Sequence, residues 1–175
     1  VFGVSGQCYL SEALSKRSAN KGSCAQYCRL PYDLFDANGE EIINQKHLLS
    51  MKDLNLSSQI EDLIEAGVQS LKIEGRLKDV TYVKNVTAYY RQAIDAILNT
   101  STKYKKSSYG KSTIAFTPNL EKSFNRSFTK YFLNGRTNEV ENKMWSINSP
   151  KSIGEPVGKI IKSDKKSITI KTDKK

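Results

Sequence analysis

The chain has 175 residues, of which 38% are hydrophobic, and its formal net charge is +10. This length is enough for one domain, or for one small domain and part of another. The sequence contains no run of about 18 apolar residues, so it predicts no membrane-spanning helix. The first residues show neither an initiator Met nor a basic leader, so we expect a piece of a longer protein without a signal peptide.

The positive charge is concentrated in the second part of the chain. Residues 1–99 carry 11 Lys and Arg against 12 Asp and Glu, whereas residues 100–175 carry 17 against 6. A basic segment attracts polyanions, RNA above all, because it neutralises phosphates and releases their counterions. A solvated lysine-rich surface that keeps the protein soluble is the alternative.

The predicted elements of the first part alternate between strands and helices. In chain order we expect a strand at 1–6, a helix at 8–16, a helical turn at 24–28, a hairpin of strands at 30–36 and 41–43, a helix at 57–66, a strand at 68–73 and a helix at 79–99. Ser57 is expected to cap its helix and Gly67 to end it.

The order helix, strand, polar residues, helix is that of a βα-barrel unit, in which functional groups gather at the carboxyl ends of the strands. It makes Lys72, Glu74 and Arg76 candidates for contacts with a substrate; the alternative is a strand-end ion pair that fixes the loop. Because a whole barrel needs about 250 residues, residues 1–99 would supply at most its last βα units.

The second part is predicted to hold a linker and a small β-domain. Residues 100–152 form a basic extension with a short helix, in which the spacing of Phe124, Phe128 and Phe132 predicts a buried helical stripe. Base stacking and phosphate contacts are the alternative for this aromatic and basic stretch. Residues 153–175 are predicted to begin a β-domain with a hairpin. The expected class is therefore α/β, with a partial barrel-like segment, a basic linker and the start of a β-domain.

All three cysteines, Cys8, Cys24 and Cys28, fall within 21 residues. Their odd number argues against a disulfide framework and favours a reducing, cytoplasmic compartment. Thiolates bind iron–sulfur clusters and zinc, and three of them need a fourth ligand, which His47 would supply in a Cys₃His zinc site. Three small buried thiols without a metal are the alternative.

Five motifs occur in the order of a known family. They are Ser-Gly-Gln-Cys at 5–8, Arg-Ser-Ala-Asn at 17–20, Cys-Ala-Gln-Tyr-Cys-Arg-Leu at 24–30, Leu-Ser-Met-Lys-Asp-Leu at 49–54 and Lys-Ile-Glu-Gly-Arg at 72–76. On these motifs the chain resembles the peptidase U32 family, whose members are usually labelled collagenase-like proteases. Residues 124–126 and 153–158 are also similar to the family's C-terminal region.

The resemblance implies two competing activities. The family label implies hydrolysis of peptide bonds, whereas several bacterial members are implicated in hydroxylating tRNA, rRNA or a quinone precursor. Some members hold a [4Fe-4S] cluster on four cysteines, and Cys8, Cys24 and Cys28 match the last three of these. The fourth lies near or before Val1 in the family pattern, where this sequence has no cysteine.

We therefore expect the parent protein to be an iron–sulfur-dependent enzyme that hydroxylates tRNA or rRNA, with the cluster site empty in this piece. A peptidase and a non-catalytic RNA-binding module are the alternatives. Arg17, Asn20 and Arg29 flank the cysteines and would either bind an anionic substrate or neutralise thiolate charge. A partial barrel would also expose apolar faces, which predicts self-association.

A peptidase mechanism has little support in the residues. A cysteine protease needs a thiolate activated by a positioned His. The single histidine is His47, and nothing in the spacing of the sequence supports a triad of His47 with Asp53 or Asp33. The sequence has neither a G-x-S-x-G nor an H-E-x-x-H motif. His47, Glu74 and Arg76 are kept as catalytic candidates.

Overall fold

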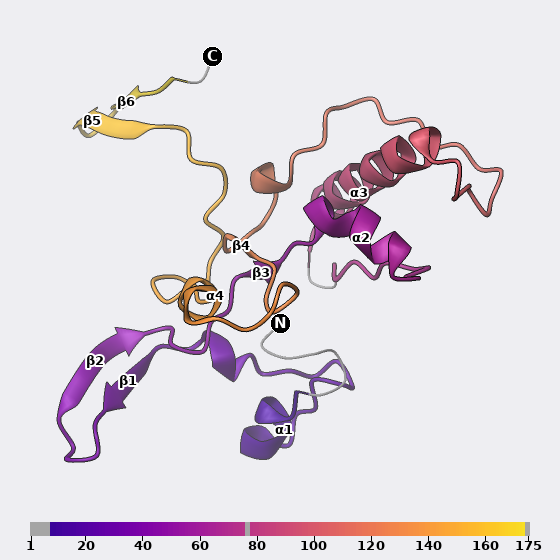
Figure 1. Cartoon of the computed structure of the whole chain (residues 1–175). Helices are drawn as coiled ribbons and strands as arrows, with labels where there is room; N and C mark the ends of the chain where they lie inside the picture. The colour runs from indigo at the N-terminus through magenta and orange to yellow at the C-terminus, as the bar shows by residue number, and fades with distance from the viewer. Residues whose placement is uncertain (1–7, 76–77, 174–175) are drawn as a thin grey trace.

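The computed structural model describes residues 8–75 and 78–173 (Figure 1). Its helices are α1 (Leu10–Ser15), α2 (Ile60–Glu65), α3 (Val80–Thr100) and α4 (Asn138–Lys143). Its strands are β1 (Tyr32–Phe35), β2 (Glu41–Lys46), β3 (Asp53–Leu54), β4 (Phe128–Thr129), β5 (Lys159–Ser163) and β6 (Ile168–Lys171). Short 3₁₀ turns cover Tyr27–Arg29, Ser57–Gln59 and Leu120–Lys122.

The strands form three sheets of two strands each, and within the described residues they do not close into a barrel. Helices and strands are both present, as an α/β class requires, but the barrel-like arrangement predicted for residues 1–99 is not seen in this part of the chain. The predicted strand at 1–6 lies outside the described residues. None of the described helices is long and apolar enough to cross a membrane.

The predicted hairpin after the cysteines is confirmed. β1 and β2 pair antiparallel, with Leu34 opposite Ile43. The Asp36 carboxylate closes the turn by accepting hydrogen bonds from the N–H groups of Asn38 and Glu40 at 2.8 Å each. Gly39 has a φ of +84°, the left-handed region that glycine adopts without steric cost. Figure 1 shows this hairpin projecting from the body of the molecule.

The two predicted helices on either side of residue 70 also form, and α2 packs against α3 (Figure 1). Asp79 caps α3 because its carboxylate accepts a hydrogen bond from the Tyr82 N–H at 2.6 Å. Gly67 follows α2 with a φ of +87°, as expected. Ser57 does not cap that helix: it begins a 3₁₀ turn, and α2 starts three residues later without a side-chain cap.

The predicted strand at 68–73 does not form, and residues 68–72 are exposed. A strand needs a neighbour that satisfies its backbone N–H and C=O groups, and no described strand pairs with this segment. The helical turn predicted at 24–28 is also displaced, since the observed 3₁₀ turn covers Tyr27–Arg29. Helix α1 lies inside the predicted range of 8–16.

The centre of the molecule is built from two parts of the chain that are distant in sequence. β3 pairs parallel with β4, so that Asp53 lies opposite Phe128 and Leu54 opposite Thr129. An antiparallel bridge joins Met51 to Trp145. The buried apolar side chains gather around these pairings and under α3: Cys28, Met51, Ile60, Val86, Ala88 and Met144.

The predicted helical stripe of Phe124, Phe128 and Phe132 is wrong. Ser127 and Tyr131 have φ values of +65° and +47°, which no right-handed helix accommodates. Phe128 lies in β4, and Phe132 remains 41% exposed.

The predicted C-terminal hairpin is confirmed. β5 and β6 pair antiparallel, and the Asp164 carboxylate accepts hydrogen bonds from the N–H groups of Lys166 and Ser167 in the turn between them. Every residue of both strands is exposed, and Figure 1 shows the pair standing apart from the rest of the chain. The division into domains at residues 99 and 152 stays a prediction.

Candidate functional site

The thiol segment runs from Cys8 to Arg29 and folds around α1. Cys8 and Cys24 are partly exposed and Cys28 is buried, and all three thiols are free. Ser11, at 2% exposure, holds the segment together because its hydroxyl accepts a hydrogen bond from the Ala25 N–H at 2.9 Å. The Cys24 sulfur accepts one from the Gln26 N–H at 3.3 Å.

The electrostatics of Cys28 show that the other two thiols influence it. Burial raises the pKa of Cys28, since a thiolate loses hydration there, and the neighbouring Arg29 opposes the rise. Cys24 and Cys8 raise this pKa further, because a second thiolate nearby repels the first. Nevertheless, no three Cys, His, Asp or Glu side chains of the described residues are gathered closely enough to hold a metal ion.

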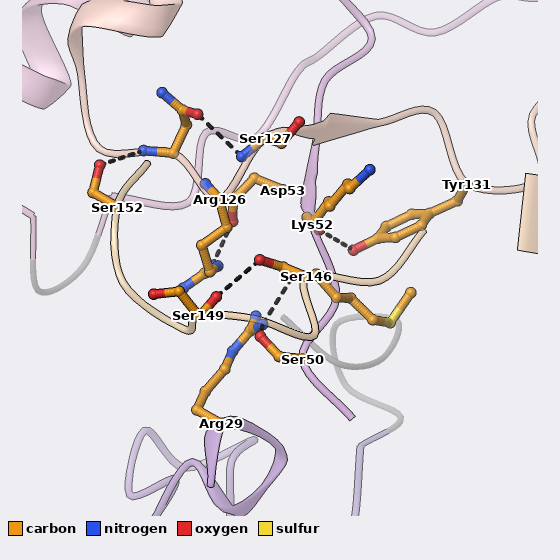
Figure 2. A network of polar contacts seen from close by, with 12 residues as sticks. Arg29, Ser50, Lys52, Asp53, Arg126, Ser127, Tyr131, Ser146, Ser149 and Ser152 are labelled. Carbon is orange, nitrogen blue, oxygen red and sulfur yellow. Dashed lines mark hydrogen bonds and ion pairs between the residues drawn. The ribbon is translucent and has the colours of Figure 1, made fainter. Parts of the chain in front are cut away.

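Arg29 connects the thiol segment to the centre of the molecule. Its Nη1 donates a hydrogen bond to the Ser50 hydroxyl at 2.8 Å, and Figure 2 shows the two residues side by side. The same nitrogen donates to the Met51 carbonyl, also at 2.8 Å. Ser50 is fully buried. Burial and the charge of Arg126 both lower the pKa of Arg29, which shows that two guanidinium groups share this region.

His47 also links the thiol segment to the centre of the molecule. Its Nδ1 lies 2.9 Å from the Arg29 carbonyl oxygen, which fixes the tautomer with a proton on Nδ1. The His47 N–H donates to the Ile147 carbonyl at 2.9 Å. The ring is therefore oriented by backbone contacts, and the two aspartates considered as triad partners bind elsewhere: Asp53 binds Arg126, and Asp33 binds Gln45.

Asp53 and Arg126 form the ion pair at the centre of the network in Figure 2. The Arg126 N–H donates to one oxygen of Asp53 at 2.8 Å, and its guanidinium Nη2 donates to the other. Arg126 is 13% exposed and Asp53 26%, so solvent screens the pair only partly. The buried Nε of Arg126 has no hydrogen-bond partner among the described residues.

The segment after β4 closes the network from the other side. The Ser146 N–H donates to the Ser50 carbonyl at 2.6 Å, and the Ser146 hydroxyl to the Ser149 carbonyl at 2.8 Å (Figure 2). Asn125, only 3% exposed, binds the Ser152 hydroxyl through its N–H and the Ile153 N–H through its carbonyl.

A third cation lies near this ion pair. The Lys78 Nζ is 2.9 Å from the centre of the Phe124 ring, and the Arg126 Cζ is 5.1 Å from the same ring. Burial and the charges of Arg126 and Arg29 lower the pKa of Lys78, while Asp53 opposes them. Three cations, Lys78, Arg29 and Arg126, thus interact with two carboxylates, Asp53 and Asp79, and this leaves a positive balance.

The other predicted site residues that the structure describes lie at the surface. Lys72 and Glu74 form an ion pair of 3.1 Å with side chains 75% and 56% exposed. The exposed Arg17 donates through Nε to the Ser23 carbonyl at 2.9 Å. Asn20 is exposed. Arg76 lies outside the described residues, so its role stays a prediction.

Sequence reasoning singled out the thiols and Arg29, whose roles stay predictions, but it did not single out the Asp53–Arg126 pair as part of the site. Asp53 was present in the motif at 49–54, Arg126 in the stretch at 124–126, and Ser152 borders the stretch at 153–158. All three stretches had already been singled out by their resemblance to the family. Their occurrence together in one chain was the signal that these residues share a site.

The comparisons with known proteins identify the family of the chain. The family model Peptidase family U32 matches residues 1–143. The chain belongs to this family. No solved structure matches the chain.

Relatives in the family carry two kinds of name. The chain is 47% identical over 166 residues to the 23S rRNA 5-hydroxycytidine C2501 synthase of Escherichia coli, covering 95% of this chain and 25% of the relative. It is 32% identical to the tRNA hydroxylation protein P1 of Bacillus subtilis, covering 91% and 38%. It is 39% identical to a collagenase of Porphyromonas gingivalis, covering 78% and 36%. The chain thus spans well under half of these relatives' length.

Proposed function

We propose that the protein to which this chain belongs hydroxylates rRNA or tRNA in the cytoplasm with the help of a [4Fe-4S] cluster. The observation that carries the proposal is the 47% identity, over 95% of this chain, to a protein named as an rRNA hydroxycytidine synthase. The relative named for tRNA hydroxylation supports the same chemistry on another RNA. Free thiols in all three cysteines fit a reducing compartment.

Three thiolates are the right kind of ligand for such a cluster, although the described structure does not bring Cys8, Cys24 and Cys28 close enough together to hold a metal ion. Cys8, Cys24 and Cys28 are free, and Cys28 feels the charge of the other two. A [4Fe-4S] cluster takes four thiolates and supplies one-electron redox chemistry when bound. The fourth thiolate would come from outside these three residues. Zinc held with His47 is the alternative, in which the His47 Nε2 would be the ligand because Nδ1 faces the Arg29 carbonyl.

The residues around the thiols support an anionic centre. Arg29 binds Ser50 and Met51 through its side chain, so its guanidinium is held in place beside Cys28. A fixed positive charge stabilises neighbouring thiolates and draws a phosphate toward them. We assign substrate positioning to Arg29, and extend the same role to Arg17 and Asn20 in the thiol segment and to Lys72, Glu74 and Arg76.

Iron and acid-labile sulfide, measured in protein purified without oxygen, test the cluster. About four of each per protein, lost in a Cys8→Ala, Cys24→Ala, Cys28→Ala triple variant and kept in Lys21→Ala, are expected. Mass spectrometry of rRNA and tRNA from cells that carry either variant tests the hydroxylation. Iron-free wild-type protein, or unchanged RNA hydroxylation in the triple variant, would contradict the proposal.

Peptide hydrolysis is the second candidate, and the 39% identity to a collagenase over 78% of this chain favours it. It predicts cleavage of a denatured collagen substrate that Cys8→Ala or His47→Ala abolishes. Cleavage that survives both changes would count against a cysteine mechanism in this chain.

We also propose that the exposed apolar side chains are covered in the assembled protein. Val68, Leu71 and Val80 are 39%, 37% and 69% exposed, beside the segment predicted as a barrel strand. The barrel-like domain would cover them with a neighbouring strand, and this chain by itself would self-associate through them. Light scattering on the purified chain tests this self-association, and a monodisperse monomer would contradict it.

A further inference from the structure

A cleft of about 420 Å³ lies beside the β3–β4 pair, away from the cysteines. It is bounded by Lys52 and Asn55 from the β3 side, by Phe128, Lys130 and Tyr131 from the β4 side, and by Lys143 from α4. Its volume falls in the range of about 300–1,000 Å³ that is usual for ligand sites. None of the described residues that line it belongs to the thiol segment.

The charge of the cleft is positive. The described residues that line it include three lysines and no Asp or Glu. Lys143 is paired with Glu139 of the same helix. In the described parts of the chain, no carboxylate lies within ion-pair distance of Lys52 or Lys130, so both amines are available to a phosphate.

An aromatic ring is held at the wall of the same cleft. The Tyr131 hydroxyl donates a hydrogen bond to the Lys52 carbonyl oxygen at 3.2 Å (Figure 2). This bond fixes the ring beside the Lys52 main chain, at a residue whose φ of +47° is unusual for a tyrosine. Burial raises the pKa of Tyr131, so the phenol stays neutral at physiological pH.

We propose that this cleft binds a single-stranded segment of RNA, with Lys52 and Lys130 on phosphates and Tyr131 stacked on a base. Positive side chains that follow a backbone, combined with an aromatic ring that accepts any base, are the usual elements of single-strand binding. An acidic peptide would use the lysines but not the ring. The proposal rests on the proposed function for its choice of polyanion, and it places RNA contacts on a face that the cysteines do not form.

Fluorescence anisotropy with a labelled single-stranded RNA, titrated with salt, tests the proposal on the full chain. The Lys52→Gln, Lys130→Gln double variant should bind about tenfold more weakly at low salt. Its salt dependence should fall by about 1.4 in slope, since each phosphate contact on a single strand contributes about 0.7. Tyr131→Leu should weaken binding at every salt concentration without changing the slope, while Tyr131→Phe keeps the ring and should bind more tightly than Tyr131→Leu.

The matched control is Lys84→Gln, Lys165→Gln, which removes the same charge from exposed positions outside the cleft. Equal losses in this control and in the cleft variant would overturn the proposal, as would displacement of the RNA by an acidic peptide at equal concentration. RNA bound in the cleft by a protein that hydroxylates none would leave this inference standing and remove the proposed function. Hydroxylation of RNA by the protein, together with unchanged RNA binding by the Lys52→Gln, Lys130→Gln variant, would leave the proposed function standing and overturn this inference.

Discussion

Asp53 and Arg126 are separated by 73 positions in the chain and meet through both oxygens of the carboxylate. One bond comes from the Arg126 backbone and one from its guanidinium, so the pair fixes main chain as well as side chain. It thereby holds β4 in parallel register with β3. The thiol segment depends on the same place, because Arg29 binds Ser50 and Met51 just before β3.

Asp53→Asn should lower the free energy of unfolding by about 3 kcal/mol, because it leaves a mostly buried guanidinium without its counter-charge. Chemical denaturation followed by tryptophan fluorescence measures this, since Trp145 bridges to Met51 close by. Asp33→Asn is the matched control: its carboxylate is exposed and binds only Gln45 among the contacts we observe. Equal stabilities for the two variants would refute a structural role for the ion pair.

Asn85→Ala should destabilise the protein by about 2 kcal/mol, because it strands polar groups that the buried Asn85 satisfies. The Asn85 amide nitrogen donates to the Asn119 carbonyl and the Ser123 hydroxyl, and its oxygen accepts from the Asn119 N–H. Lys84→Ala, at the exposed neighbouring position of the same helix, should change the unfolding temperature little. If Asn85→Ala and Lys84→Ala unfold at the same temperature, α3 does not hold the segment before β4 through Asn85.

Short-range signals predicted the elements that form from their own residues. The Asn38-Gly39 turn of the first hairpin and the glycine after α2 each act within a few positions. The strand at 68–73 failed because pairing depends on a distant partner. The aromatic helix failed because its spacing says nothing of the left-handed backbone at Ser127 and Tyr131.

The site divides in the same way. The spacing of the cysteines and the position of Arg29 beside Cys28 are local, and both can be read from the sequence, while their roles stay predictions. The contacts of Asp53 with Arg126 and of Ser50 with Ser146 join residues that precede α3 in the sequence to residues that follow it. No pattern in a single sequence states which distant polar residues meet.

Gly158→Ala should unfold the C-terminal hairpin without affecting the rest of the molecule. A Cβ at Gly158 would overlap the backbone carbonyl oxygen of Lys171 and press on the side chain of Ile170. Hydrogen exchange should show loss of protection for the β5 and β6 amides alone, because none of their side chains is buried. Gly110→Ala, where an added Cβ meets nothing within 4 Å, is the control. Loss of protection in α3 would show that the hairpin supports the core.

The metal-free protein should become less stable as the pH rises, because the Cys28 thiol loses its proton. Burial raises the pKa of this thiol, so the folded state holds its proton more tightly than the unfolded state does. The resulting stabilisation is complete below the pKa of the unfolded chain, about 8.5, and is lost as pH rises through the higher folded pKa. Tyr82, Tyr90, Tyr131 and Lys78 also have shifted pKa values, so the useful quantity is the difference in unfolding free energy between wild type and Cys28→Ala. This difference should shrink between pH 8 and pH 10; a difference that stays constant with pH would place the Cys28 thiol in contact with water.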